Sequence, residues 1–206
     1  MQSIKILSSI DIKGLVSMKE AINVMEVAFK ELYLGSFKMP LRTITDFGED
    51  QLSLFYKPSF MPKEDIIGVK LLGQSKKKSL NGNPTIQGIV ILINSKTNSI
   101  VGILDGTYLT TLRTGAASGI ATRYLARKES SVLALFGAGA QGHSQFEAIC
   151  CERNITKAYI YDIDLKAADR FVDYYKSWST TELVATTELS CLKEVDIICT
   201  ATNSSK

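Results

Sequence analysis

The sequence predicts an α/β protein in which an antiparallel sheet is followed by a parallel strand–helix–strand part. Three observations support this fold class. Apolar residues recur with period 2 through residues 42–105, with short turns between the runs, and such short connections imply antiparallel pairing. From residue 131 onward, short apolar runs alternate with helical segments, the pattern of a parallel sheet with crossover helices. A glycine-rich turn directly follows the first of these runs.

Composition and charge narrow the class of protein. The chain has 206 residues, 45% hydrophobic and 22% charged, with a net charge of +3. These are ordinary values for a globular chain with a core, and the net charge is too small to argue for nucleic acid. The first 130 residues hold 17 Lys/Arg against 11 Asp/Glu. This local excess suits a small anionic substrate, but a solvated surface explains it equally well.

The cysteine and histidine content argues against a metal site. Cys150, Cys151, Cys191 and Cys199 lack metal-ligand spacing, so we expect reduced thiols in a cytoplasmic protein. The single histidine, His143, argues against a zinc site or a Ser-His-Asp triad. We find no signal peptide and no apolar run of membrane-spanning length, so we expect no membrane partner.

The N-terminal sequence predicts a strand over residues 4–7 and then a helix that packs against the core and shows no sign of a catalytic role. Ser17 and Glu20 have the spacing of a capping box. Apolar residues follow at helical spacing, and Gly35 is placed to end the helix. Strands are then expected over residues 42–46, 51–56, 66–72, 85–94 and 100–105. The Lys-rich run over residues 75–79 could bind phosphate, but we favour a solvated loop.

Lys70 lies in the middle of an otherwise apolar strand. The alternating residues on both of its faces are apolar. A buried lysine must meet an anion or lose its charge, because desolvation disfavours the ammonium. The alternative is a stem that reaches solvent. We favour a functional role.

A long helix is expected over residues 107–126. Its middle, Gly115 to Gly119, is unusually small, which suggests close packing on another backbone, and Arg113 lies just before it. This helix leads to the glycine-rich part. We therefore predict a first domain over residues 1–127 and a second over 128–206.

The glycine turn is the strongest local motif. An apolar strand over residues 132–136 runs into Gly137-x-Gly139-x-x-Gly142, and a helix is expected over 144–151. Backbone N–H groups and a helix dipole bind pyrophosphate at such a turn, so we predict dinucleotide binding. Asp162 ends the next strand, where a carboxylate binds the adenosine ribose and favours NAD over NADP. Asp164 fits a helix N-cap better.

The rest of the chain continues the alternation. The expected strands and helices are 157–161, 165–175, 183–185, 189–192 and 195–199. Only the first half of a dinucleotide fold is then present, since a full one has about six strands. The strand over 195–199 would be left at a sheet edge as an aggregation hazard. We therefore expect a Rossmann domain truncated after its fourth strand, in the N-terminal part of a longer protein.

Six stretches, in this order, resemble the ornithine cyclodeaminase/mu-crystallin family, including its archaeal-type alanine dehydrogenases and ketimine reductases. They are Met39-Pro40-Leu41-Arg42, Gly68-Val69-Lys70, residues 81–88, residues 105–114, Gly137-Ala138-Gly139-Ala140-Gln141 and Tyr161-Asp162. The resemblance implies a substrate-binding, dimerising antiparallel domain followed by an NAD(P)-binding Rossmann domain. Asn83 departs from the family, which has an apolar residue there, and this leaves the substrate preference open.

The resemblance also implies roles for individual residues. Arg42, Lys70 and Arg113 match ligands of a substrate carboxylate, and Lys70 could also relay a proton, so it is the catalytic candidate. Further matches are expected beside the cofactor: Thr85, Arg113, Gly137, Gly139, Ala140, Gln141, Asp162, Thr200 and Thr202. The family's catalytic acid would lie beyond residue 206, so no residue here is assigned that role.

The implied function is NAD-dependent hydride transfer at the α-carbon of a small amino acid or cyclic imino acid, by a homodimer. Three cations gather only around an anion such as a carboxylate, which Arg grips bidentately. Two alternatives stay open: a mu-crystallin-like binding protein, and an inactive fragment that lacks the downstream acid. An unrelated Rossmann enzyme gives no reason for Lys70 and ranks last.

Overall fold

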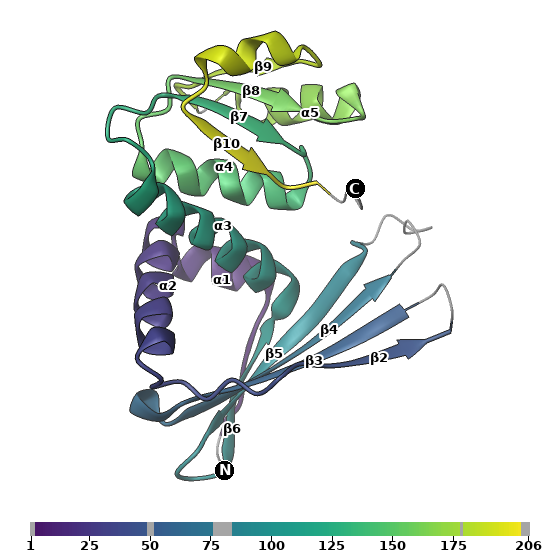
Figure 1. The fold of residues 1–206 in the computed structure, drawn as a ribbon. Helices are drawn as coiled ribbons and strands as arrows, with labels where there is room; N and C mark the ends of the chain where they lie inside the picture. The colour runs from purple at the N-terminus through teal and green to yellow at the C-terminus, as the bar shows by residue number, and fades with distance from the viewer. Residues whose placement is uncertain (1–2, 49–51, 76–83, 178, 203–206) are drawn as a thin grey trace. The chain divides into compact units, whose positions relative to one another are not determined.

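The computed structural model describes residues 3–48, 52–75, 84–177 and 179–202 (Figure 1). The chain forms two compact units, one of Met1–Ser17 with Val27–Thr110 and one of Met18–Glu26 with Thr111–Lys206. Two long helices therefore contribute residues to both units. The assignment of separate functions to residues 1–127 and 128–206 stays a prediction.

The first unit is built on a six-stranded sheet in the order β1-β6-β5-β4-β3-β2 (Figure 1). Its strands are β1 (Lys5–Leu7), β2 (Thr43–Phe47), β3 (Leu52–Met61), β4 (Ile66–Ser75), β5 (Ile86–Asn94) and β6 (Ser99–Asp105). The pairs from β2 to β6 are antiparallel, which confirms the prediction. The short β1 adds a parallel strand beside β6.

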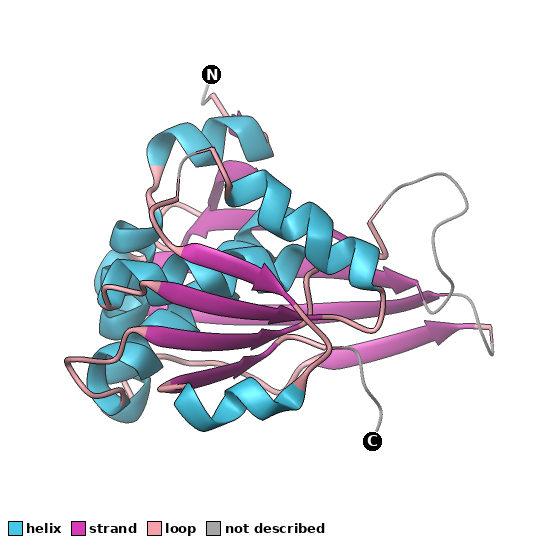
Figure 2. Ribbon diagram, turned by 90° about the horizontal axis from the view of Figure 1, so that it is seen from above, coloured by secondary structure: helices cyan, strands magenta, loops and turns pink. Residues whose placement is uncertain are grey.

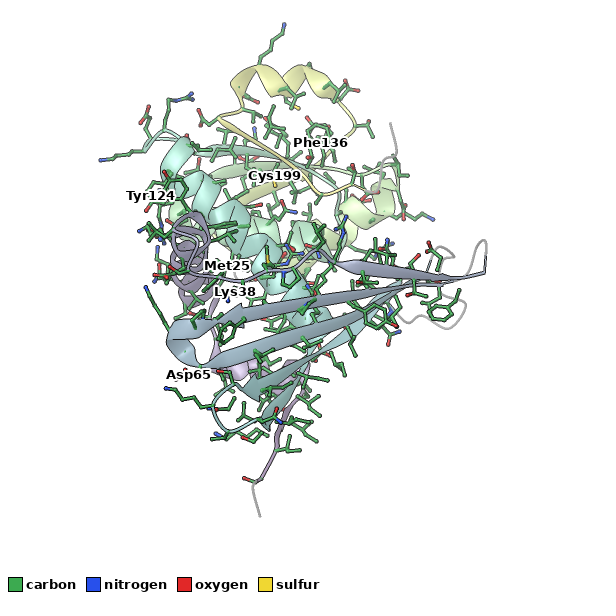
Figure 3. The ribbon with its side chains drawn as sticks, turned by 60° about the horizontal axis from the view of Figure 1, so that its bottom comes forward. Met25, Lys38, Asp65, Tyr124, Phe136 and Cys199 are labelled. Carbon is green, nitrogen blue, oxygen red and sulfur yellow. The ribbon has the colours of Figure 1, made fainter. Side chains whose placement is uncertain are left out.

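The β3–β4 hairpin is longer than the sequence predicted, since β3 continues past Tyr56 to Met61. Pro58 obscured this continuation, because proline cannot donate to a strand ladder. The pairing between β2 and β3 covers Leu52–Tyr56, so Pro58 lies beyond its end. The hairpin then turns through the short helix η1 (Pro62–Glu64) and Asp65, which has a φ of 55° (Figure 3).

Two helices precede the strands β2 to β6. Helix α1 (Ser9–Leu15) was missed, because seven residues are too few to show a helical period. Its capping box is nevertheless in the sequence: Asp11 N–H donates to Ser8 Oγ at 3.3 Å, and Ser8 N–H donates to Asp11 Oδ2 at 2.8 Å. Helix α2 (Met18–Tyr33) is confirmed, and Gly35 follows it with a φ of 71°.

The second unit has a four-stranded parallel sheet (Figure 2), whose strands lie in the order β10-β7-β8-β9 (Figure 1). Its elements after α3 (Gly106–Leu125) are β7 (Val132–Phe136), α4 (Ala140–Glu152), β8 (Lys157–Tyr161), α5 (Leu165–Tyr175), β9 (Glu182–Ala185), η2 (Leu189–Glu194) and β10 (Ile197–Thr200). In chain order these strands lie 4-1-2-3, which is one half of a doubly wound dinucleotide fold. The predicted parallel α/β part is confirmed.

The two faces of this sheet are covered differently. Helices α4 and α5 pack on one face, and their core is formed by Leu133, Leu135, Phe146, Ile160 and Phe171. The other face contributes Ala134, Tyr159 and Tyr161, which pack against the segment that contains η2. Because every strand has apolar residues on both faces, its sequence reads as a continuous apolar run.

The small residues in α3 pack closely, as predicted. A Cβ on Gly115 would lie 2.4 Å from the carbonyl oxygen of Ser144 in α4. A Cβ on Gly119 would lie 2.6 Å from Ile22 of α2. Glycine at both positions therefore allows three helices of the second unit to approach one another. Among the described residues, no helix combines the length and apolar character needed to span a bilayer.

Candidate functional site

The glycine turn joins β7 to α4 and needs glycine at two of its three positions. Gly137 has a φ of 104°, and a Cβ there would lie 2.5 Å from the carbonyl oxygen of Ala201. A Cβ on Gly142 would lie 2.0 Å from the carbonyl oxygen of Gly137. A Cβ on Gly139 would meet no heavy atom within 4 Å. Gly139 therefore leaves space for a bound group, while Gly137 and Gly142 permit the turn itself.

Helix α4 begins earlier than predicted, at Ala140 rather than Ser144. Gly139 is its N-cap, with extended backbone and no side chain to accept from the first-turn N–H groups. The first turn has no acidic residue. Ala140 and Gln141 thus open a helix whose positive end faces the turn, an arrangement that suits an anion. Gln141 Oε1 is buried and accepts no hydrogen bond from the residues described.

Asp162 lies beside this turn, at the end of β8. Its Oδ2 accepts from Ala138 N–H at 2.9 Å, and its Oδ1 accepts from Asp164 N–H at 3.0 Å. Two backbone donors therefore fix the orientation of the carboxylate. Asp164 is the N-cap of α5 and accepts from Lys166 N–H at 3.1 Å, as predicted.

Thr200 and Thr202 reach the turn from β10. Thr200 is paired with Phe136 at the end of β7, and Ala201 N–H donates to Phe136 carbonyl at 2.6 Å. Figure 3 labels Phe136 and the neighbouring Cys199 on these two strands. Both threonines are exposed. The second unit therefore brings all its predicted cofactor residues, apart from Arg113, to the carboxyl ends of its parallel strands.

A buried polar cluster below the turn was missed from the sequence. Cys199 Sγ donates to Gln145 Oε1 at 2.7 Å, and Ser118 Oγ donates to the same oxygen at 3.0 Å. Burial raises the pKa of the Cys199 thiol to about 11 and that of Cys150 to about 12. These thiols stay protonated at neutral pH, so they are structural groups rather than nucleophiles.

His143 is held among aromatic rings on α4. Its ring stacks on Phe171 at a centroid distance of 4.3 Å, and its Nδ1 lies 3.2 Å from the Tyr175 hydroxyl. Burial lowers the pKa of His143. A neutral, packed imidazole is consistent with a structural role.

Lys70 lies in the first unit, where β4 runs between β3 and β5. Its Nζ is 3.3 Å from Oγ1 of Thr110, near the start of α3. Thr110 Oγ1 donates its own proton to the Gly106 carbonyl at 2.6 Å, so it presents a lone pair to Lys70. Thr110 is buried. The sequence offered no signal for this partner beyond its position inside the family-like stretch 105–114.

Two glycines bring the start of α3 onto the sheet. A Cβ on Gly106 would lie 2.8 Å from the carbonyl carbon of Gly88 in β5, and a Cβ on Gly88 would lie 2.3 Å from the Leu71 carbonyl oxygen. Gly88 N–H also donates to Thr107 Oγ1 at 3.1 Å. The helix start therefore touches the strand backbone, which places Thr110 within reach of Lys70.

A second lysine lies directly opposite Lys70. Lys57 on β3 is its cross-strand partner. Arg42 directly precedes β2, whose first residue, Thr43, is paired with Tyr56, the neighbour of Lys57. We call Arg42, Lys57 and Lys70 the cation row. Lys57 was not among the predicted site residues, because the sequence predicts a strand that ends at Tyr56.

The other predicted site residues belong neither to the cofactor residues around the glycine turn nor to the cation row. Thr85 is exposed just before β5, and its carbonyl accepts from Ser75 N–H at 2.8 Å. Lys76 to Lys78 and Asn83 lie outside the described residues. Arg113 is an exposed residue of α3 in the second unit. Its gathering with Arg42 and Lys70 stays a prediction.

Comparison with known proteins shows which family this chain resembles over its length. The ornithine cyclodeaminase/mu-crystallin family matches residues 3–206. The alanine dehydrogenase of Archaeoglobus fulgidus is 34% identical over 201 residues, which cover 98% of this chain and 61% of that relative.

Solved structures agree. The Thermococcus litoralis Δ1-pyrroline-2-carboxylate reductase, in complex with NADH and L-proline, matches with a TM-score of 0.92 and 36% identity, over 98% of this chain and 62% of that one. An archaeal alanine dehydrogenase dimer with bound NAD matches with a TM-score of 0.88 and 33% identity, over 98% and 62%. This chain therefore spans less than two thirds of these relatives' lengths. On the whole-chain match and these likenesses, the chain belongs to the ornithine cyclodeaminase/mu-crystallin family.

Proposed function

We propose that this protein binds NAD with its second unit and acts on a small amino acid or cyclic imino acid by hydride transfer at the α-carbon. The observation that carries the proposal is the cation row: Lys57 and Lys70 are directly paired on adjacent strands, and Arg42 directly precedes β2. Positive side chains on neighbouring strands attract an anion. A substrate carboxylate is such an anion, and it is common to amino and imino acids.

The second unit fits NAD. The uncapped start of α4 and the open space at Gly139 suit a pyrophosphate. Asp162 is oriented beside them to accept hydrogen bonds from a ribose diol, and its charge would repel a 2′-phosphate. When bound, NAD supplies the hydride acceptor or donor, and the protein supplies position and charge. Gly137, Ala140, Gln141, Thr200 and Thr202 complete the proposed cofactor edge.

The chain's own residues would hold and orient the substrate. Lys70, steadied by Thr110, would bind one carboxylate oxygen and could move a proton there. Arg42 could grip the same carboxylate with two parallel hydrogen bonds. Arg113 as the third carboxylate ligand, and Thr85 as a neighbour of the cofactor, belong to the same proposal through the family resemblance.

The related enzymes oxidise or reduce a C–N bond, and family members named for cyclodeamination close a ring with loss of ammonia. Hydride transfer at the α-carbon is common to both reactions. We extend the dimeric state of the archaeal alanine dehydrogenase to this protein. Light scattering during size-exclusion chromatography tests that extension.

Turnover and cofactor binding must be measured separately on the whole protein. NADH fluorescence titration reports binding, and assays with alanine, proline and ornithine report NADH and ammonia independently. We expect Lys70→Ala to abolish turnover and to retain NADH binding, and we expect Arg113→Ala to abolish turnover. Lys96→Gln, at an exposed turn of the first unit, is the control for a lost positive charge. Undiminished turnover in both alanine variants would refute the binding of the substrate carboxylate by Lys70 and Arg113. NADH binding without any turnover in the wild type would indicate a cofactor-binding protein.

A further inference from the structure

The side chain of Gln145 is a buried amide that joins three elements of the second unit. Gln145 lies in α4 and is 7% exposed. Its Oε1 accepts from Sγ of Cys199 in β10 at 2.7 Å and from Oγ of Ser118 in α3 at 3.0 Å. An amide is costly to bury, because it needs hydrogen-bond partners that an apolar side chain of similar size does not need. Packing of the core alone therefore gives no reason for glutamine at this position.

Cys199 is a buried side chain of β10 that comes directly before the proposed cofactor residues. It is 9% exposed, whereas Thr200 and Thr202 are exposed. The thiol can donate to Gln145, because burial raises the pKa of Cys199 to about 11 and keeps the proton on sulfur at neutral pH. The bond to Gln145 thus holds β10 one residue before Thr200.

The segment that follows Cys199 touches the glycine turn directly. A Cβ on Gly137 would lie 2.5 Å from the Ala201 carbonyl oxygen, so this carbonyl occupies the space that Gly137 leaves open. Ala201 N–H also donates to the carbonyl oxygen of Phe136, the residue before Gly137, at 2.6 Å. The position of the end of β10 and the shape of the turn therefore depend on each other.

Hydrogen bonds define this position more sharply than apolar contacts do. Cys199 belongs to the apolar core between the sheet and its helices, and apolar burial is non-directional. A hydrogen bond, in contrast, weakens steeply when its angle changes. Ser118 donates to the same amide oxygen and so holds the amide in its orientation. Two donors on one oxygen therefore define where β10 lies relative to α4.

We propose that Gln145 is a positioning residue for the cofactor: its amide oxygen holds the end of β10, and with it Thr200 and Thr202, at a fixed distance from the start of α4. This inference rests on the proposed function, in which those threonines and the start of α4 hold NAD. Gln145 lies five residues after Ala140, the first residue of α4, which is about 7.5 Å along the helix axis at the usual rise per residue. Buried at this depth, Gln145 acts through β10 rather than by contact with the cofactor.

The test measures the Kd for NADH of the whole protein by fluorescence titration, well below the melting temperature of each variant. Gln145→Met keeps the length of the side chain and removes the acceptor, and Cys199→Ala removes the donor. We expect each to raise the Kd about fivefold, within the range that the loss of one neutral hydrogen bond allows. Cys199→Ser keeps a donor and should bind NADH within about twofold of the wild type. The double variant of Gln145→Met and Cys199→Ala should bind no more weakly than either single variant, since both remove the same bond.

Thr181→Val is the matched control for the loss of a hydrogen bond between two segments of the second unit. Thr181 Oγ1 donates to the Ile155 carbonyl oxygen at 2.7 Å, and both residues lie near the amino ends of the parallel strands. Urea unfolding should show a loss of stability for this variant, whereas its Kd for NADH should match that of the wild type. A rise of the Kd in Thr181→Val as large as that in Gln145→Met would overturn the positioning role.

The outcomes separate this inference from the function it rests on. If the wild type binds NADH, and both Gln145→Met and Cys199→Ala lose stability at an unchanged Kd, the positioning role is wrong and the proposed function stands. Effects that add in the double variant overturn the link through Cys199 in the same way. A wild type that does not bind NADH overturns both. If Gln145→Met does not fold, the difference in Kd between Cys199→Ala and Cys199→Ser decides.

Discussion

The ammonium nitrogen of Lys70 lies 3.3 Å from Oγ1 of Thr110, and Thr110 donates its only hydroxyl proton to the Gly106 carbonyl oxygen 2.6 Å away. The threonine oxygen can therefore only accept from the lysine. This fixes one direction of the ammonium group. Thr110, whose residue type alone does not indicate a role in the site, thus orients Lys70, the main candidate for substrate binding.

Replacement of Thr110 by valine should weaken substrate binding. Valine keeps the shape but removes the acceptor, and a hydrogen bond to a charged group contributes about 1.5–3 kcal/mol. We expect KM to rise roughly tenfold or more, with a smaller change in kcat. Thr110→Ser restores the acceptor and should restore KM.

Acetylation of Lys70 distinguishes a positioning role of Thr110 from a merely structural one. If Thr110 positions Lys70, the pH dependence of Lys70 acetylation, followed by mass spectrometry, should shift in Thr110→Val and not in Thr110→Ser. Acetylation of Lys96 serves as the internal control, because its side chain is exposed. A profile for Lys70 that is the same in all three proteins would contradict the positioning role.

The glycines of the turn should separate folding from cofactor binding. Gly142→Ala places a Cβ 2.0 Å from the Gly137 carbonyl oxygen, so urea unfolding should show a loss of about 1–3 kcal/mol or more. Gly139→Ala meets no atom within 4 Å and should fold normally. We expect it to lose NADH affinity in fluorescence titration, since its methyl group would occupy the space proposed for phosphate. Unchanged affinity would argue against pyrophosphate at this turn.

Asp162 should set the choice between NADH and NADPH. Asp162→Asn removes the negative charge that opposes a 2′-phosphate, and we expect the NADH/NADPH affinity ratio to fall about tenfold, a change of about 1.4 kcal/mol. Asp164→Asn is the matched control, because asparagine is an equally good N-cap. Equal ratios in both variants would remove Asp162 from the cofactor site.

Acid should destabilise the second unit through Glu152. Hydrogen bonds from Arg123 at 2.8 Å, together with Lys19 at 2.9 Å, lower the pKa of Glu152 below its ordinary value of 4.5. Because the folded pKa is the lower one, the unfolded chain binds the proton first as pH falls. The stabilisation is complete well above pH 4.5 and is lost as pH drops through the folded pKa.

The check is the free energy of unfolding measured from neutral pH to about pH 3. Glu152→Gln should be less stable than the wild type at neutral pH, and the difference should shrink in acid. Glu129→Gln, 75% exposed, should follow the wild type throughout, since exposed ion pairs contribute about 0–1 kcal/mol. A constant difference between Glu152→Gln and the wild type would exclude this linkage.

Local patterns determined most of the architecture. The change of period near residue 42 and the later alternation of strands and helices predicted both sheets, and the small residues of α3 predicted its close packing. The errors have local causes. Seven residues hid α1, Pro58 hid the second half of β3, and the glycines hid the first turn of α4.

The sequence by itself determined the glycine turn, Asp162 as the acid beside it, and Lys70 as a cation in an apolar strand. Each of these depends on residue type and near neighbours, which periodicity and spacing reveal. The register of β3 on β4 and the approach of α3 decided the rest: Lys57 opposite Lys70, and Thr110 against its ammonium. These partners are 13 and 40 residues away in the chain, and contacts between such distant residues arise only when packing closes the fold.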